Sequence, residues 1–244
     1  MGAVVFGSGK NMIPEIGTHN LANREKWLEL ALQQIPAGSR ILDAGAGELQ
    51  YKRFCSHLNY VSQDFAKYDG NGNGSGLQVG GWDQSRIDIV SDITSIPRPD
   101  SSFDAIMCIE VLEHLSNPVL ALHELARLLR RGGQLIVTAP FCSLTHFAPY
   151  YYANGFSRYF FETHLNELGF QILDLEENGN YFEYLAQEVR RIPVFAKRFA
   201  GTEPRIWEKG LLFMVLKMLE RFSRKDKGSK EALHFGCFVR AIKQ

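Results

Sequence analysis

Short apolar runs alternate with longer amphipathic segments along most of this chain. The runs have the length of β-strands and lie at residues 40–45, 59–64, 86–92, 102–109, 132–141, 171–178 and 233–244. The amphipathic segments have apolar residues at the three- and four-residue spacing of one helix face, and they lie at residues 21–35, 49–58, 110–130 and 158–170. Glycines mark several of the junctions, where turns are favoured. The pattern predicts seven strands that alternate with helices or loops.

This alternation is typical of an α/β protein with a doubly wound, mostly parallel sheet of seven strands. Ligands of such sheets bind outside the carboxyl ends of the strands. The pattern is interrupted once, because a long helical segment lies between the sixth and seventh strands. We therefore expect a core at residues 1–180, a helical insertion at 181–232, and a final strand at 233–244 that completes the core sheet.

The composition favours a soluble, globular protein without a strong attraction to nucleic acid. Apolar residues make up 45% of the chain, and 27 Lys and Arg balance 27 Asp and Glu. The charge is unevenly distributed, because residues 181–231 carry a net charge of +5 and the rest of the chain carries −5. Because the net charge is zero, the chain as a whole does not attract nucleic acid, and any anion binding must come from a local basic patch.

Several features favour a cytoplasmic location. The four cysteines are scattered without a CxxC pair, which argues against a zinc knuckle or a disulfide framework. The opening segment MGAVVFGSGKNMIP lacks the charged region and the long apolar run of a signal peptide. The most apolar run, at residues 210–216, is far shorter than a membrane span.

A carboxylate and two glycines stand where the first predicted strand ends, in the segment ILDAGAGELQY. Asp43, Gly45 and Gly47 would form a tight strand-to-helix turn with an accessible backbone, which is a common nucleotide-binding feature. Asp64 and Asp92 end the second and third strands, so all three acids are expected at one edge of the sheet. A nicotinamide dinucleotide fold would require a third glycine where Gln50 stands, which weakens a dehydrogenase interpretation.

This ordered set of strand-end acids resembles that of the class I S-adenosylmethionine-dependent methyltransferases, in particular type 11-like bacterial members with the Rossmann-like methyltransferase fold. The resemblance implies S-adenosylmethionine as the cofactor. It places the turn residues near the methionine part of the cofactor, Asp64 at the ribose hydroxyls, and Asp92 with Ile93 at the adenine. Leu49 departs from the family's fuller GxGxG pattern, which leaves the path of the loop open. A descendant that binds the cofactor without turnover remains an alternative.

Two acids and two histidines form a second candidate group. The segment CIEVLEHL spaces Glu110, Glu113 and His114 so that a helix beginning there would carry them on one face, and His146 follows the fifth strand. The ExxEH spelling resembles that of ubiquinone-pathway O-methyltransferases and small-RNA 2′-O-methyltransferases. The resemblance implies that these four residues hold a divalent metal such as magnesium near the hydroxyl being methylated.

The same spelling also resembles that of metal-independent relatives, which leaves a second interpretation open. Without a metal, His146 or His114 is the candidate general base, because an imidazole titrates near neutral pH. Glu110 completes the predicted catalytic set. We expect alanine at any of these three positions to reduce turnover.

The methyl acceptor is predicted only as a class. Residues 139–170 resemble a bacterial subgroup often associated with surface-polysaccharide and glycan pathways, and their aromatic side chains could stack on a sugar or a flat ring. The favoured function is O-methylation of a hydroxyl on a small-molecule or glycan-linked substrate. A lipid-quinone methyltransferase, an RNA 2′-O-methyltransferase and a non-catalytic cofactor-binding module are the alternatives.

Two further segments carry open predictions. Residues 205–227 form an amphipathic helix with basic flanks, which either packs on its own domain or a dimer partner, or contacts an anionic membrane peripherally through Trp207 and Phe213. Such a contact would bring the active site to a lipid-linked substrate. The glycine-rich residues 69–76 are either a flexible connector or an active-site lid.

Overall fold

The computed structural model describes residues 14–244, so the opening segment considered above lies outside the described residues except for Pro14. Contacts within the chain divide these residues into two units. The core unit contains residues 22–178 and 235–244, and the hairpin unit contains residues 14–21 and 179–234. The residues that precede the first long helix therefore group with the insertion and not with the core.

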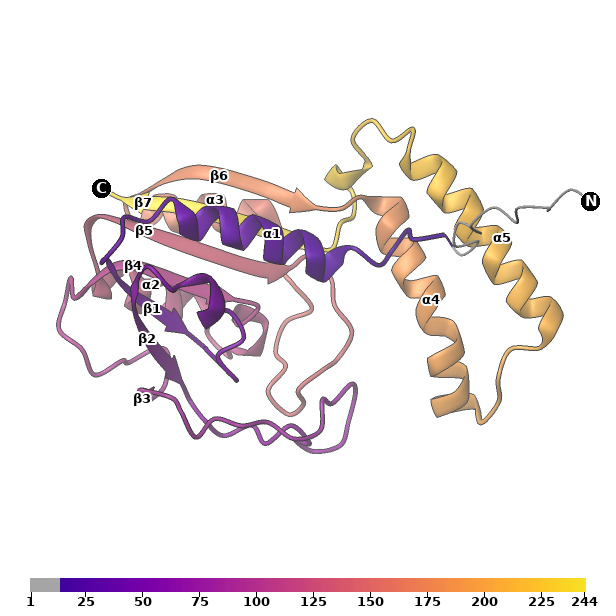
Figure 1. Ribbon diagram of the computed structural model, residues 1–244, viewed down its shortest axis with the longest axis horizontal. Coiled ribbons are helices and arrows are strands. Elements are labelled where there is room, and N and C mark those ends of the chain that lie inside the picture. The colour runs from indigo at the N-terminus through magenta and orange to yellow at the C-terminus, as the bar shows by residue number, and fades with distance from the viewer. Residues whose placement is uncertain (1–13) are drawn as a thin grey trace, which may run out of the picture. The chain divides into compact units, whose positions relative to one another are not determined.

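The core unit is built on one sheet of seven strands (Figure 1). The strands are β1 (Arg40–Ala44), β2 (Asn59–Asp64), β3 (Ile89–Val90), β4 (Phe103–Ile109), β5 (Leu129–Pro140), β6 (Phe170–Asn178) and β7 (Gly236–Lys243). They lie in the order β3-β2-β1-β4-β5-β7-β6, and β7 is antiparallel to both of its neighbours while the other pairs are parallel. The predicted fold class is confirmed.

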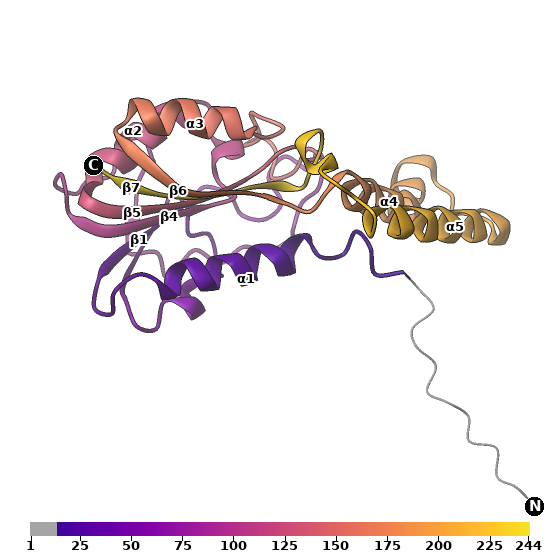
Figure 2. The ribbon, with the colours of Figure 1, turned by 90° about the horizontal axis from the view of Figure 1, so that it is seen from above.

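Helices cover both faces of this sheet (Figure 2). Helix α1 (Asn20–Gln33) lies on one face, and α2 (Pro118–Leu128) and α3 (Arg158–Glu167) lie on the other. An apolar layer separates the sheet from each set of helices. Leu28 and Leu32 of α1 are fully buried, and burial of one such side chain contributes about 1.5–3 kcal/mol to stability.

Two predicted helices differ from what the structure shows. The segment after the glycine turn forms only a 3₁₀ turn, η1 (Lys52–Phe54), because Leu49 has a φ of 65° that no α-helix accommodates. The helix predicted to begin at Glu110 does not form either, because Glu110 has a φ of 55°. A 3₁₀ turn, η2 (Leu112–His114), follows, and α2 begins only at Pro118, where the Asn117 side chain accepts a hydrogen bond from the Leu120 amide.

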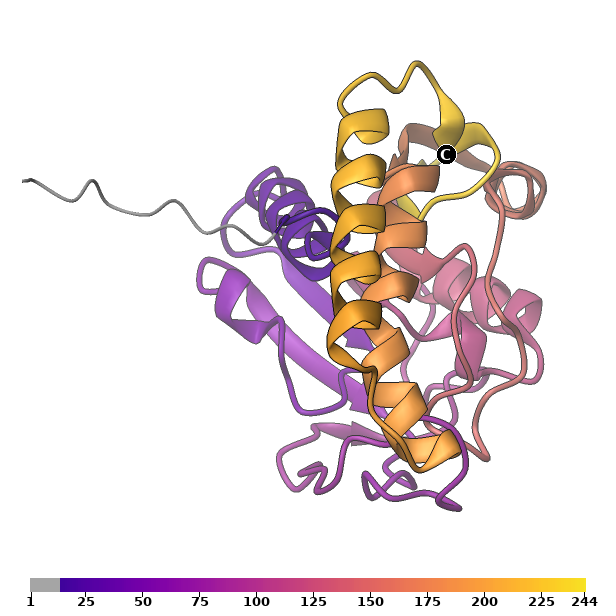
Figure 3. The ribbon, with the colours of Figure 1, turned by 90° about the vertical axis from the view of Figure 1, so that its right-hand side faces the viewer.

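The hairpin unit consists mainly of two long helices, α4 (Tyr181–Ala200) and α5 (Ile206–Ser223), followed by η3 (Ser229–Glu231). Asn180 caps α4 by accepting hydrogen bonds from the amides of the first turn, and Gly201 ends it with a φ of 64°. The helices run side by side (Figure 3) and bury a small apolar layer that contains Leu216 and Leu219. None of the helices in residues 14–244 has the length and hydropathy of a segment that spans a bilayer.

Candidate active site

The glycine turn follows β1 and is fixed by backbone hydrogen bonds to β2. The amides of Gly45 and Ala46 both donate to the Gln63 carbonyl, at 2.8 and 2.9 Å. Gly45 has a φ of 80°, and a Cβ there would lie 2.5 Å from Cγ2 of Val111. Gly47 has a φ of 52°, and its Cβ would lie 2.7 Å from the Trp82 ring. Both the backbone conformation and the close neighbours therefore require glycine.

Leu49 occupies the place of the glycine that the motif lacks. Its φ of 65° lies in the left-handed region, where a leucine costs about 1–2 kcal/mol relative to ordinary backbone conformations. The turn thus has a left-handed backbone at this position although the sequence has no glycine there. Strain of this kind is concentrated at functional sites.

Asp43 lies at the end of β1 and is buried, with 2% of its surface exposed. Its Oδ2 accepts a hydrogen bond of 2.5 Å from the Tyr60 hydroxyl on β2. Burial raises the pKa of the Asp43 carboxyl to about 7, although the Tyr60 hydroxyl partly offsets this effect. The structure therefore ties this acid to the neighbouring strand, and its contact with the cofactor stays a prediction.

The raised pKa of Asp43 predicts a stability that depends on pH. Between about pH 4 and pH 7 the folded state keeps a proton that the unfolded state has released, so the free energy of unfolding falls as pH rises. We expect Asp43→Asn to remove this dependence and to stabilise the protein by about 2–4 kcal/mol at pH 8. Urea unfolding at pH 5 and pH 8 measures both effects. A variant with the same pH dependence as the wild type would contradict this assignment.

Asp64 ends β2 and faces the glycine turn. Its Oδ2 accepts from the Gly47 amide at 2.9 Å, and its Oδ1 accepts from the Ala66 amide at 2.9 Å and from Gln84 Nε2 at 2.8 Å. A carboxylate can accept about four hydrogen bonds, so protein groups occupy most of its capacity. The structure brings Asp64 to the turn, and its predicted contact with the ribose stays a prediction.

Asp92 and Ile93 follow β3, whose two residues make it shorter than predicted. The Asp92 Oδ1 accepts from both the amide and the hydroxyl of Thr94 at 2.8 Å, and the amide bond lowers the pKa of this carboxyl. The Ile93 side chain is 5% exposed and packs in the apolar core. These residues form an ordered turn, and their predicted place at the adenine stays a prediction.

Glu110 follows β4 in the left-handed conformation noted above. One carboxylate oxygen accepts a 2.8 Å hydrogen bond from the Thr138 hydroxyl on β5, and the other forms a 2.8 Å ion pair with Arg24 on α1. The Glu110 amide also donates to the Thr138 carbonyl at 2.9 Å. The carboxylate is therefore engaged by α1 and β5 and does not join the other three residues predicted to hold a metal.

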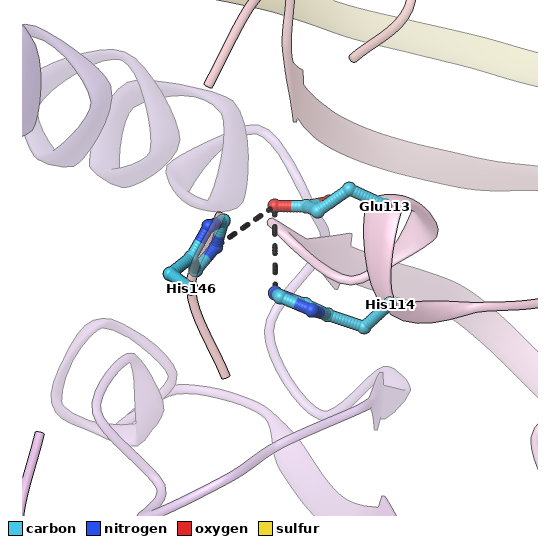
Figure 4. Close-up of side chains that lie close together, drawn as sticks. All are labelled: Glu113, His114 and His146. Carbon is cyan, nitrogen blue, oxygen red and sulfur yellow. Dashed lines mark ion pairs between the residues drawn. The ribbon is translucent and has the colours of Figure 1, made fainter. Parts of the chain in front are cut away.

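The other three residues of that set do come together (Figure 4). Glu113 and His114 lie on η2, His146 lies on the segment after β5, and their ligand atoms lie within 4.8 Å of one another. The Glu113 Oε1 is 3.7 Å from His114 Nε2 and 4.0 Å from His146 Nε2. We call these three residues the Glu-His-His cluster. It lies beyond the carboxyl ends of β4 and β5, at the edge of the sheet where ligands were predicted to bind.

Backbone carbonyls orient both imidazoles of the Glu-His-His cluster. His114 Nδ1 lies 2.6 Å from the Tyr150 carbonyl, and His146 Nδ1 lies 2.8 Å from the Leu144 carbonyl. A carbonyl only accepts hydrogen bonds, so each Nδ1 carries a proton and donates it. In the neutral rings the lone pair is then on Nε2, the atom that faces Glu113.

The charge state of the cluster follows from its burial. Burial, together with the neighbouring His146, lowers the pKa of His114 to about 4, so this ring is neutral at pH 7. Glu113 is 1% exposed, and burial together with the Glu110 carboxylate raises its pKa well above the usual range. Its Oε2 has no hydrogen-bond partner within the described part of the chain. A buried oxygen without a partner is costly, and a bound cation would relieve this cost.

The glycine-rich loop lies against the segment that carries His146. The Leu77 amide donates to the Thr145 carbonyl at 2.9 Å, and the Phe147 amide donates to the Leu77 carbonyl at 3.1 Å. A Cβ on Gly76 would lie 2.4 Å from the Thr145 carbonyl oxygen, so the loop needs glycine to approach this closely. The loop is thus held beside the cluster, and its function as a lid stays a prediction.

Aromatic side chains surround the histidines. The rings of His114 and Phe147 are stacked with their centroids 5.1 Å apart, and the Tyr151 ring lies 5.2 Å from that of His146. Tyr68 and Trp82, from the loop that follows β2, pack against Phe147 at 4.6 and 5.4 Å. The Trp82 ring also covers Gly47, so aromatic residues connect the glycine turn with the cluster.

Several residues of this site were not predicted from the sequence. Arg24, Trp82 and Gln84 lie in segments whose patterns give no sign of a role. Thr138 could have been noticed in the sequence, because it is a polar residue in the otherwise apolar run LIVTAP. The structure shows that it is completely buried. A polar residue in a buried strand needs a hydrogen-bond partner, which here is Glu110.

Comparisons with known proteins agree with this geometry. Residues 42–137 match the profile of the family described as Methyltransferase domain. A demethylmenaquinone methyltransferase of Renibacterium salmoninarum is 30% identical over 123 residues, which cover 48% of this chain and 49% of that protein. A ubiquinone biosynthesis O-methyltransferase of Xanthomonas oryzae pv. oryzae is 31% identical over 109 residues, covering 42% of this chain and 43% of that protein. The chain spans less than half the length of these two relatives.

A solved structure extends the comparison to most of the chain. A SAM dependent methyltransferase from Archaeoglobus fulgidus superposes with a TM-score of 0.56 over 91% of this chain and 94% of that one. Its sequence is 13% identical, so this likeness shows a shared fold alone. The sequence matches indicate a methyltransferase domain at residues 42–137, and the fold agrees with this assignment.

Proposed function

We propose that this protein transfers the methyl group of S-adenosylmethionine to a hydroxyl of a small-molecule substrate at the Glu-His-His cluster. The observation that carries the proposal is the convergence of two imidazole Nε2 atoms and one buried carboxylate at the carboxyl ends of β4 and β5. The sulfonium of the cofactor is already activated, so the protein must mainly align the nucleophile and manage its proton.

The histidines supply the proton acceptor in this proposal. His114 and His146 both direct Nε2 toward Glu113, and the protonated Nδ1 of each ring is fixed on a carbonyl. A substrate hydroxyl beside either Nε2 could donate its proton there as it attacks the methyl group. Glu110 does not take part in this step, because Arg24 and Thr138 occupy its carboxylate. We propose that Glu110 instead fixes the backbone that leads into η2.

The same three side chains fit a divalent metal ion. Two neutral imidazoles held by carbonyls and one carboxylate with an unsatisfied oxygen are a usual ligand set, and the carbonyls are the usual partners of metal-binding histidines. Imidazole nitrogen suits zinc, iron or nickel better than magnesium, so we propose a transition metal where the sequence suggested magnesium. When bound, such an ion lowers the pKa of a coordinated hydroxyl.

The aromatic surroundings favour a substrate with a flat or ring-shaped face. The rings of Phe147 and Tyr151 contact the histidines directly, and the Trp82 ring packs against Phe147. Such rings can stack on a flat substrate. Of the two relatives named above, the ubiquinone biosynthesis O-methyltransferase has a name that specifies transfer to oxygen, which supports a phenolic hydroxyl as the first acceptor to test. A glycan-linked hydroxyl, predicted from residues 139–170, is the second acceptor to test.

The proposal is tested by incubating the purified protein with methyl-labelled S-adenosylmethionine and separate phenolic, glycan, lipid and RNA fractions. We expect label in the phenolic or glycan fraction, and loss of transfer after chelation with recovery on addition of zinc, iron or nickel. Metal binding measured on wild type and Glu113→Gln provides a readout that does not depend on activity. Label only in RNA, or binding of S-adenosylhomocysteine without any transfer, would contradict the proposal. Transfer that chelation leaves intact would refute its metal version alone.

A further inference from the structure

The hairpin unit exposes an apolar surface that the methyl-transfer site does not use. On α5, Trp207, Leu211, Met214 and Met218 are 57%, 52%, 66% and 42% exposed. Their spacing of four, three and four residues places them on one helix face, which we call the outer stripe. Single exposed apolar residues are ordinary on protein surfaces, but a continuous stripe of this kind usually marks a binding surface.

The outer stripe is distinct from the face by which α5 packs on α4. Leu216 and Leu219 are 7% and 5% exposed and form the apolar layer of the hairpin with Ile16 and Ala186. The sequence predicted one apolar face on this helix, whereas the structure divides its apolar residues into an inner face and an outer stripe. Packing within the hairpin therefore accounts for only part of the apolar surface of α5.

The turn between the two helices extends this surface. Near the end of α4, Val194 and Phe199 are 62% and 65% exposed, and Ile206 at the start of α5 is 85% exposed. Lys197 and Arg198 stand among them, and the Arg198 guanidinium lies 5.1 Å from the centre of the Phe199 ring. The tip of the hairpin thus combines large exposed apolar side chains with exposed cations.

Positive charge is concentrated beside the C-terminal half of the outer stripe and just beyond its end. Residues 205–227 contain seven Lys or Arg and three Asp or Glu, a net charge of +4. The Lys217 ammonium lies 5.8 Å from the Phe213 ring centre, and the Arg221 guanidinium lies 5.0 Å from that of Phe222. The acids have local partners, because Glu208 caps the Arg205 amide and Glu220 pairs with Lys217. With seven cations and three acids, this segment is positively charged overall.

We infer that the hairpin tip and the outer stripe of α5 bind the surface of an anionic lipid bilayer. Apolar and aromatic side chains would enter the interface between head groups and acyl chains, while the adjacent Lys and Arg keep their charges at the anionic head groups. The attraction of these cations to an anionic surface adds to the apolar contact and is screened by salt. The inference does not depend on the methyl-transfer reaction, because no residue of the Glu-His-His cluster takes part in it.

A second copy of the chain is the other occupant considered, and the charge distribution disfavours it. A twofold interface places the same surface of each copy against the other. Two segments of net charge +4 would then face each other, and repulsion between like charges would oppose the apolar contact. An anionic lipid surface neutralises the same charges.

Flotation of the full chain with vesicles tests this inference. We expect binding to phosphatidylcholine vesicles that contain phosphatidylglycerol, weak binding to pure phosphatidylcholine, and a large decrease at high salt. Trp207→Glu with Met214→Glu should reduce the bound fraction at least about tenfold, since charged residues enter the bilayer interface poorly. Lys217→Glu with Arg221→Glu should reduce binding to anionic vesicles.

Leu120→Glu is the matched control, because Leu120 lies on α2 of the core unit and is 48% exposed, close to the exposure of Leu211. This variant should bind anionic vesicles as the wild type does, and thermal unfolding should show that all variants are folded. Several results would overturn the inference: no vesicle binding by the wild type, equal binding to neutral and anionic vesicles, or no effect of the stripe variants. A dimer in analytical ultracentrifugation that only the stripe variants dissociate, without vesicle binding, would identify the second copy as the occupant.

Discussion

Glu113→Gln is expected to reduce methyl transfer at least about 100-fold while the affinity for S-adenosylhomocysteine changes by less than about twofold. The substitution keeps the shape of the side chain but removes the ionisable carboxyl, whose Oε1 lies 3.7 and 4.0 Å from the two Nε2 atoms. Because burial raises the pKa of the Glu113 carboxyl, an uncharged amide there should also raise the stability of the metal-free protein by about 1–3 kcal/mol at alkaline pH. Less activity with more stability is the signature of a functional acid.

Glu124→Gln provides the matched control for this variant. Glu124 is also a buried glutamate, but it accepts from the Ile96 amide at 2.7 Å and forms a 2.7 Å ion pair with Arg127. Its replacement should lower stability and leave the turnover of the folded enzyme near the wild-type value. Label transfer and chemical unfolding of the two variants measure the contrast. Equal turnover of Glu113→Gln and the wild type would remove Glu113 from the catalytic site.

Gly45→Ala is expected to lower the affinity for S-adenosylhomocysteine at least about tenfold, and Gly38→Ala is its control. The two glycines have nearly the same φ, 80° and 79°, so alanine has a similar backbone cost of about 1–2 kcal/mol at both positions. Only Gly45 has a close neighbour, since its Cβ would lie 2.5 Å from Val111, whereas nothing lies within 4 Å of a Cβ at Gly38.

The difference in affinity and stability between these two variants therefore measures the effect of the close contact at the glycine turn, separately from the cost of the left-handed backbone. Gly45→Ala should lose about 1–3 kcal/mol of stability more than Gly38→Ala because of overpacking against Val111. Calorimetric titration with S-adenosylhomocysteine and thermal unfolding measure both quantities. If both variants bind with wild-type affinity, the glycine turn does not contact the cofactor.

The sheet could be predicted because its signals are local. The strand that ends at Asp64 begins and ends where its apolar run indicates, and the glycine turn after Asp43 follows β1 as predicted, although a 3₁₀ turn and not the predicted helix comes after it. Buried parallel strands are short apolar runs, and turns with a positive φ select glycine, so both leave a mark on neighbouring residues.

The geometry around Glu110 could not be predicted because distant residues determine it. The spacing of Glu110, Glu113 and His114 fits one face of a helix, and no local residue contradicts this interpretation. The left-handed backbone at Glu110 accompanies contacts with Arg24, 86 positions earlier, and Thr138, 28 positions later. Such contacts have no signature in sequence spacing, and they separate Glu110 from the other three residues of the predicted metal site.

The position of His146 could be predicted from the sequence, but its tautomer and its backbone contacts could not. Its place after the fifth strand predicted that it would lie near the acids, because the ends of parallel strands share one edge of the sheet. Its tautomer depends on the Leu144 carbonyl, and its segment forms backbone hydrogen bonds with Leu77, directly after the glycine-rich loop. These backbone contacts do not depend on side-chain identity and could not be inferred from it.

The chemistry assigned to the cluster is tested most directly by the bond that the transferred methyl group forms. S-adenosylmethionine with a carbon-13 methyl group is incubated with the enzyme and the acceptor fraction, and the product is examined by carbon-13 NMR. We expect a signal from a methyl group bound to oxygen, absent from the product of Glu113→Gln and retained with Glu124→Gln. A methyl group bound to carbon or nitrogen, or an oxygen-bound methyl that Glu113→Gln still forms at the wild-type rate, would contradict hydroxyl methylation at the Glu-His-His cluster.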